Sequence, residues 1–287
     1  MSRRPTPSAL AGAPLLVAHR CGAGLAPENT LLAMLRSRDD WAADMIELDV
    51  HVSADGHVVV IHDPTVDRTT DGSGAVAAMT LDQLRAFDAG YRFTTDGGQT
   101  FPFRGQGLRI PTLDEVLDAL PDMRFTVEVK AVAAQGPMFE LVRRRGAQDR
   151  IVAAGIHDVV RTRFSEWKGA VSASMEQARA FYLRHRLHLG RRRAPAVDAF
   201  QVPETWGRLH IVTPRFIRDA HELGIAVQVW TVNDAADMER LFRWGVDGIQ
   251  SDFPDRLSAV MTRLFGRPPA PALVRSSATP GAATPLE

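Results

Sequence analysis

Short apolar runs alternate with segments of helical period along most of the chain. Runs that suit buried strands lie at 14–18, 44–50, 124–130, 150–154, 169–173, 197–202, 225–231 and 246–250. Segments with helical spacing lie near 28–38, 112–120, 137–146, 157–166, 175–189, 214–223, 234–243 and 254–264. Eight strands, each followed by a helix, over about 250 residues predict a (β/α)8 TIM barrel of the α/β class. A doubly wound open sheet is the weaker alternative, because no glycine-rich dinucleotide fingerprint follows the first strand.

One long interval breaks this alternation, between the second strand and the helix near 112. It begins with Asp55-Gly56 between two apolar runs, which indicates a hairpin. From about 65 to 110 it carries many glycines and short apolar pieces, which predicts a small subdomain inserted after the second strand. We expect 14–265 to form the barrel and 1–13 to be a flexible N-terminus. The segment 266–287 is rich in Pro, Ala, Ser and Thr and is expected to be a disordered tail.

The composition suits a soluble globular protein, since 45% of the 287 residues are hydrophobic and 24% are charged. The formal net charge is zero, so no global electrostatic argument supports binding to nucleic acid or to an anionic membrane. The chain has one cysteine, which excludes an intrachain disulfide and suits a reducing compartment. Prolines interrupt the apolar stretch near the N-terminus, and no apolar run is long enough to span a membrane. We therefore expect a cytoplasmic protein.

Charged and histidine side chains stand at the ends of the first three predicted strands and of the hairpin. They are His19, Arg20, Glu47, Asp49, His62, Glu128 and Lys130. A single pair of carboxylates on a strand more often lies on a solvated edge than in a functional site. A single histidine at a strand end is more often structural than catalytic. Barrel strands are buried on both faces, however, and charges there are costly unless they are paired or bind a metal. The same anomaly at three strand ends therefore predicts a functional site on the C-terminal rim.

The residue types in this set indicate the chemistry. Glu47 and Asp49 are two residues apart, so both point to the same face of their strand. Carboxylate oxygens without a cysteine cluster favour Mg²⁺ or Ca²⁺ over a thiolate zinc site. A cation beside Arg20 and Lys130 makes a receptor for phosphate, and two histidines supply a general acid and a general base. Metal-assisted cleavage of a phosphodiester uses all of these parts.

Four motifs, in this order, resemble the successive signatures of the glycerophosphodiester phosphodiesterase family: AHRCGAGLAPENT, IELDVHVSADGHVVVIHDPTVDRTTDG, IPTLDEVL and VEVK. Later, VQVWTVND and GVDGIQSDFPDRL resemble the last two strands of that family. The resemblance covers residues from about 15 to 264. It implies a TIM barrel with an inserted subdomain. It also implies hydrolysis of glycerophosphodiesters to an alcohol and sn-glycerol 3-phosphate, as in glycerophospholipid breakdown.

The resemblance also implies roles for individual residues. A divalent cation would be held by Glu47, Asp49 and Glu128. Acid and base catalysis would come from His19 and His62, in an order that the sequence leaves open. Arg20 and Lys130 would bind the phosphate, and Trp230 would line the substrate pocket. The family mechanism begins with attack of the glycerol 2-hydroxyl on phosphorus, and water then opens the cyclic phosphate. The family usually has glycine where Cys21 stands, so a side chain there would crowd the substrate or add an oxidisable thiol.

Two other functions stay open. Residues 176–193 carry six arginines and two histidines against a single acid, with an apolar side at helical spacing. A basic amphipathic helix of this kind suits peripheral contact with a membrane, which would favour a lysophospholipase D. It is more typical, however, of an outer barrel helix with a solvated basic face. The third hypothesis is a non-catalytic barrel that binds a phosphorylated ligand. Asp234 and the acidic positions 237 and 239 are interpreted as charges that complement a helix dipole.

Overall fold

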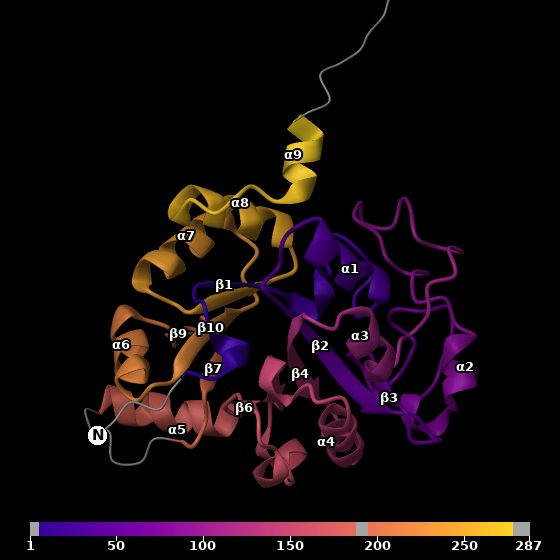
Figure 1. Ribbon diagram of the computed structural model, residues 1–287, viewed down its shortest axis with the longest axis horizontal. Coiled ribbons are helices and arrows are strands. Elements are labelled where there is room, and N and C mark those ends of the chain that lie inside the picture. The colour runs from indigo at the N-terminus through magenta and orange to yellow at the C-terminus, as the bar shows by residue number, and fades with distance from the viewer. Residues whose placement is uncertain (1–5, 188–194, 278–287) are drawn as a thin grey trace, which may run out of the picture.

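The structure, a computed structural model, describes residues 6–187 and 195–277, and its framework is a parallel sheet closed into a barrel (Figure 1). Around the barrel the strands follow the order β6, β5, β4, β2, β1, β11, β10 and β7. Their bounds are β1 Leu15–Ala18, β2 Met45–Val52, β4 Arg124–Val129, β5 Ile151–Ala154, β6 Ala170–Val171, β7 Ala199–Pro203, β10 Ala226–Trp230 and β11 Gly248–Ser251. A parallel bridge between Ser172 and Ala199 joins the β6 end to β7. The expected TIM barrel is confirmed, and this closure excludes the open sheet.

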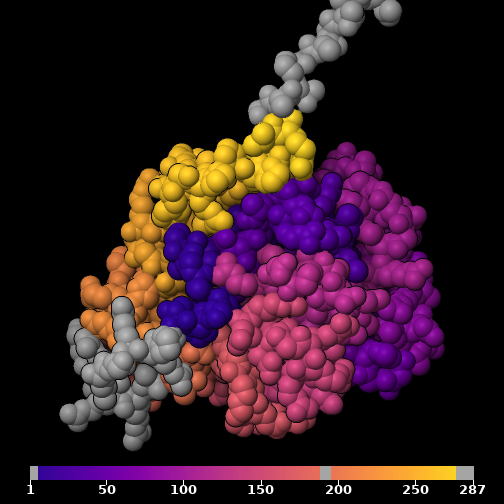
Figure 2. Space-filling view, in the orientation of Figure 1, coloured from indigo at the N-terminus to yellow at the C-terminus, as the bar shows by residue number. Residues whose placement is uncertain are grey.

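The barrel interior is apolar at the end where the strands begin. Leu15 and Val17 of β1 pack there against inward-facing side chains of β2, β5, β6 and β7. Ala9 and Leu10, in a 3₁₀ turn over Ser8–Leu10, complete this cluster and are 1% and 3% exposed. Figure 2 shows the indigo N-terminal segment seated between the pink, orange and yellow parts of the chain. The expectation of a flexible N-terminus is therefore wrong for these residues, which close the bottom of the barrel; residues 1–5 lie outside the described part.

Helices surround the barrel as the sequence predicts, with one exception. Their bounds are α1 Leu31–Asp39, α3 Leu113–Ala119, α4 Gln135–Arg144, α5 Met175–Arg186, α6 Pro214–Glu222, α7 Ala235–Trp244 and α8 Pro254–Phe265. The helix expected over 157–166 is replaced by two 3₁₀ turns, Asp158–Arg161 and Phe164–Glu166. The Arg163 N–H donates to the side chain of Gln135 at 2.8 Å instead of to a carbonyl one turn back. This bond satisfies the backbone without a continuous helix, in a segment whose β-branched valines favour helix weakly.

The inserted subdomain begins with the predicted hairpin. Strand β3, Val58–Val60, runs antiparallel to the end of β2, and Gly56 in the connecting turn has a φ of 86°, which glycine adopts without strain. The insertion also holds a 3₁₀ turn over Val76–Ala78 and helix α2, Leu81–Arg85. Its buried core is separate from that of the barrel and consists of Val59, Ile61, Val66, Val76, Leu81, Leu84, Ala89 and Ile110. The insertion is thus a small packed unit beside α1 and α3 (Figure 1).

The chain after the barrel differs in part from the expected disordered tail. Helix α9 covers Pro271–Ser277, and the Ala272 N–H donates to the Asp40 carbonyl at 3.0 Å. Ala270 is fully buried, and Arg267 binds Asp44 through two hydrogen bonds of 2.6 and 2.7 Å. These contacts hold residues 266–277 against the barrel, while 278–287 lie outside the described residues. Among the described helices, none is both long and apolar enough to cross a membrane.

Candidate active site

A cavity of about 100 Å³ opens at the C-terminal ends of the barrel strands. All the side chains that the sequence assigned to the site line it: His19, Arg20, Glu47, Asp49, His62, Glu128, Lys130 and Trp230. They come from β2, β4 and β10 and from the segments that directly follow β1, β3 and β4. In parallel strands, carboxyl ends meet at one rim, so residues far apart in sequence meet there. The predicted set is therefore brought together in one place.

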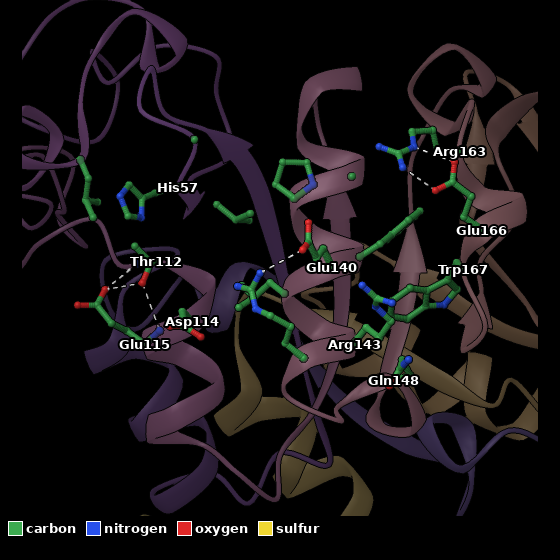
Figure 3. A pocket seen from close by; sticks show the side chains of 18 of the residues that line it. His57, Thr112, Asp114, Glu115, Glu140, Arg143, Gln148, Arg163, Glu166 and Trp167 are labelled. Atoms are coloured by element: carbon green, nitrogen blue, oxygen red, sulfur yellow. Dashed lines mark hydrogen bonds and ion pairs between the residues drawn. The ribbon is translucent and has the colours of Figure 1, made fainter.

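A larger cavity, of about 1050 Å³, lies on the outside of the barrel over α4 (Figure 3). Several of its charged side chains pair with one another. Arg163 pairs with Glu166 at 2.6 Å on one side, and Glu115 caps α3 and pairs with Arg85 on the other. The groove contains no cluster of metal-ligating carboxylates, because the only such group among the described residues is Glu47, Asp49 and Glu128. The smaller cavity is therefore the candidate active site.

The carboxylates of Glu47, Asp49 and Glu128 converge in this cavity, with one ligand atom of each within 4.8 Å of the others. Strand register produces this arrangement, because Asp49 on β2 lies beside Glu128 on β4. Glu47 is 4% exposed and Asp49 is 1% exposed. Burial and the adjacent Asp49 raise the pKa of Glu47 from 4.5 to about 8. Three hard oxygen donors whose charges repel at this range fit a divalent cation such as Mg²⁺ or Ca²⁺.

Asp49 is held in its charged form by its neighbours. Lys130 Nζ lies 3.0 Å from Asp49 Oδ1 and 2.6 Å from Glu128 Oε1. Asn29 donates from its side-chain amide to Asp49 Oδ2 at 3.0 Å and accepts from the Asp49 backbone N–H at 3.2 Å. Burial alone would raise the pKa of Asp49, but Lys130, then His62 and Asn29, outweigh it and lower the pKa. Asp49 is thus fixed as an anion that two side chains orient.

His19 has a carboxylate partner that the sequence analysis did not identify. Its Nδ1 lies 2.7 Å from Oδ1 of Asp252, which directly follows β11. Its Nε2 faces the cavity, 4.0 Å from Glu47 Oε2. Burial disfavours the charged ring, but the hydrogen bond to Asp252 and the charge of Glu47 prevail and raise the pKa of His19. The signal for Asp252 was present, since it ends a strand as the other site residues do.

The backbone after β1 bends sharply to place Arg20. Arg20 and Cys21 have φ angles of 43° and 69°, in the left-handed region. This turn aims the Arg20 N–H at Glu47 Oε2, 2.8 Å away. A backbone position with a φ of 69° favours glycine. This gives a physical reason why the family that the motifs resemble usually has glycine at position 21. The Cys21 side chain is 1% exposed and points to the Glu47 carbonyl, so it neither crowds the cavity nor exposes a thiol.

His62 is held in the same manner by the inserted segment. Its Nδ1 lies 2.6 Å from Asp63 Oδ1, and Arg68 donates to Asp63 Oδ2 at 2.6 Å. Arg68 also binds Glu28 through two hydrogen bonds of 2.8 and 2.7 Å, and Glu28 accepts from Arg20 at 3.4 Å. Arg68 and His62 lower the pKa of Asp63 to about 2 against the effect of partial burial. This chain of pairs couples the insertion to the rim of the barrel.

Amide and hydroxyl groups form the floor of the cavity. Gln201 donates from its side chain to Thr126 Oγ1 and to Gln228 Oε1, both at 2.8 Å. Thr126, Gln201 and Gln250 line the cavity below the carboxylates. Sequence reasoning missed this layer because single glutamines within apolar runs look like ordinary strand positions. The layer separates the charged rim from the apolar base of the barrel.

Comparison with known proteins agrees with this geometry. Residues 19–256 match the model of the glycerophosphoryl diester phosphodiesterase family. A glycerophosphodiester phosphodiesterase from Caldanaerobacter subterraneus is 33% identical over 85% of this chain and 96% of its own. A crystal structure of glycerophosphodiester phosphodiesterase from Agrobacterium tumefaciens is 27% identical, with a TM-score of 0.66 over 85% of this chain and 99% of that one. The glycerophosphoryl diester phosphodiesterase domain of an uncharacterised Mycobacterium tuberculosis protein has the same fold, with a TM-score of 0.74, 24% identity, and coverage of 88% and 100%.

The family match begins at His19 and ends after Asp252, which binds His19. It therefore includes every residue that lines the cavity. The resemblance carried by the sequence motifs is confirmed: the chain belongs to the glycerophosphoryl diester phosphodiesterase family.

Proposed function

We propose that the protein is a phosphoric diester hydrolase that converts glycerophosphodiesters to an alcohol and sn-glycerol 3-phosphate. The observation that supports this most directly is the convergence of three carboxylates, two carboxylate-bound histidines and two cationic side chains in one cavity. The name of the Caldanaerobacter relative, at 33% identity, agrees with it. Glycerophospholipid breakdown supplies substrates of this class.

Glu47, Asp49 and Glu128 would hold one divalent cation, Mg²⁺ or Ca²⁺. That ion supplies charge stabilisation for the phosphoryl oxygens and lowers the pKa of bound oxygen ligands. Arg20 and Lys130 complement the remaining phosphate charge, since each is directed into the cavity and already lies beside a carboxylate. Lys130 pairs with both Asp49 and Glu128, so it would share these two carboxylates with a bound cation.

The two histidines divide the proton transfers. Each keeps Nδ1 on a carboxylate, Asp252 for His19 and Asp63 for His62, which leaves Nε2 free to exchange a proton with substrate. One histidine takes the proton of the attacking glycerol 2-hydroxyl, and the other gives a proton to the departing alcohol oxygen. The resulting cyclic phosphate is opened by water with the two roles reversed, which restores both protonation states.

A second candidate is action on lysophospholipids at a membrane surface. Leu183 and Leu187, on or next to α5, are 60% and 64% exposed, and Arg179 and Arg186 are exposed on the same helix. The rest of the basic segment, 188–193, lies outside the described residues. An exposed apolar and basic helix supports peripheral membrane contact. A cytoplasmic location and the absence of nucleic-acid partners stay predictions.

One assay separates these functions. Glycerophosphocholine and lysophosphatidylcholine are incubated side by side, each with Mg²⁺, with Ca²⁺ and with EDTA. Release of glycerol 3-phosphate from the first substrate in a divalent ion, and not in EDTA, is the expected result. Faster cleavage of the second substrate would favour the lysophospholipase D, and cleavage of neither, with retained phosphate binding, would favour a non-catalytic barrel.

A further inference from the structure

A third cavity, of about 480 Å³, lies beside the catalytic cavity. It is lined by residues 203–205, which end and follow β7, and by 231–234, which lead from β10 into α7. Trp230 lines both cavities and is the residue that they share. On the other side of the rim, a cavity beside His62 measures about 10 Å³, which is too small for an alcohol. Substrate that extends out of the catalytic cavity therefore has room beyond Trp230.

The two arms of the substrate differ in what they require. Every glycerophosphodiester has the glycerol arm, whereas the alcohol arm varies. The catalytic cavity is small, and Thr126, Gln201 and Gln250 give its floor hydroxyl and amide groups. Such groups exchange hydrogen bonds with the glycerol hydroxyls. The inner cavity thus suits the constant arm, and the cavity beyond Trp230 suits the variable one.

The outer cavity is negatively charged. Glu204 binds Arg240 through two hydrogen bonds of 2.7 and 3.0 Å, and Arg240 also binds Asp237 at 2.6 Å, so these three groups carry one net negative charge. Asp234, which also lines the cavity, adds a second. Arg256 brings one positive group to the edge, where it donates to the Asn233 carbonyl at 3.2 Å and lies over the Phe253 ring. Acidic charge is therefore in excess in a cavity that Trp230 also lines.

We propose that the outer cavity is the subsite for the departing alcohol and that it selects alcohols with an ammonium group, such as choline or ethanolamine, over neutral ones. This inference rests on the proposed function. An ammonium group is attracted both by the face of an indole ring and by nearby carboxylates. A neutral polyol gains neither attraction. The acids of α7 thus act on the substrate, beyond the role at the helix N-terminus that the sequence suggests.

A variant can remove the charge and preserve the helix. The Asp234 side chain accepts hydrogen bonds from the Ala236 and Asp237 N–H groups at 2.8 and 3.1 Å. Asparagine is an equally good N-cap, so Asp234→Asn keeps these bonds. Adding Asp237→Asn leaves the Glu204 and Arg240 pair intact. Asp122→Asn, in the exposed turn before β4 at the opposite end of the barrel, removes one charge remote from the cavity and is the control.

The test compares kcat/KM for glycerophosphocholine and glycerophosphoinositol. In the double variant Asp234→Asn/Asp237→Asn, the ratio of the two values should fall about three- to tenfold, since each partly exposed charge contributes modestly. Asp122→Asn should leave the ratio unchanged. The preference of the unmodified protein should also shrink at high salt, because the charges are accessible to screening ions.

The outcomes separate this inference from the proposed function. Hydrolysis of both diesters with an unchanged ratio in the double variant would overturn the subsite alone. An equal fall for both substrates would do the same, because it would indicate damage to the common site. Hydrolysis of neither diester by the unmodified protein would overturn the proposed function and the subsite with it.

Discussion

Glu47 should make the metal-free protein less stable as the pH rises. In the folded chain its pKa is raised from 4.5 to about 8 by burial and by Asp49. Between these pH values the folded state keeps a proton that the unfolded chain has released. Unfolding then releases a proton, so the free energy of unfolding falls as the pH rises through this window and levels off above it. A pKa change of this size corresponds to about 5 kcal/mol above pH 8.

The substitution Glu47→Gln removes this dependence. The side-chain amide oxygen of glutamine can still accept the hydrogen bond that Arg20 N–H donates to Glu47 at 2.8 Å. At pH 6 folded Glu47 holds its proton but the unfolded chain has already released it, so the variant should be more stable by about 2 kcal/mol. At pH 9 the variant should be more stable by several kcal/mol, up to about 5. The raised pKa of His19 also makes the free energy of unfolding fall as the pH rises. Both proteins contain His19, so most of this contribution cancels when their stabilities are subtracted.

The assay is urea unfolding in EDTA at pH 6, 7, 8 and 9. Glu140→Gln serves as a control, since Glu140 has a 60% exposed side chain on α4 and loses the same charge. Divalent cation should stabilise the unmodified protein at pH 8 and stabilise Glu47→Gln much less, because one ligand oxygen has lost its charge. Parallel pH dependence of Glu47→Gln and the unmodified protein would refute the reasoning. Equal stabilisation of both by the cation would refute the placement of the ion.

Further predictions concern the rim and the insertion. His19→Ala and His62→Ala should each lower turnover about 100-fold or more with the fold intact by circular dichroism, and near-normal turnover would remove that histidine from the mechanism. Asp252→Asn should lower the pKa of His19, so the limb of the pH–rate profile that His19 governs should move to lower pH; an unmoved profile would contradict this. Cys21 should resist a thiol reagent in the native protein and react after unfolding, whereas rapid native labelling would contradict its burial. Replacing 72–106 with a Gly/Ser linker should change substrate ranking more than metal affinity, and the reverse result would make the insertion scaffolding.

The repeat of strands and helices could be predicted because each element carries its own period. The exceptions have local causes. At 157–166 a side chain of α4 satisfies the backbone, so apolar spacing no longer decides the conformation. At 8–10 two apolar residues close the barrel base, a role that depends on a partner surface and leaves no periodic signal. Residues 271–277 form a helix whose first turn is fixed by contacts with Asp40, which lies far away in sequence.

The rim residues could be predicted because charges at buried strand ends are anomalous in themselves. The residues that orient them were harder to find. Asn29 holds Asp49, whereas its neighbour Thr30 caps α1. Asp252 is a single acid after a strand, and its role depends on His19, which is distant in sequence. Positioning residues act through contacts that only the closed barrel creates.

The central claim is that the three carboxylates hold a cation with which the chain hydrolyses glycerophosphodiesters to glycerol 3-phosphate. Phosphorus NMR of glycerophosphocholine tests it most directly, because it shows which ester bond breaks. With Mg²⁺ or Ca²⁺ the diester signal should be replaced by that of glycerol 3-phosphate. This conversion should be much slower in EDTA, and also much slower in the variant Glu128→Gln with the ion present. Formation of phosphocholine, or an equal rate in EDTA and in Glu128→Gln, would contradict the account.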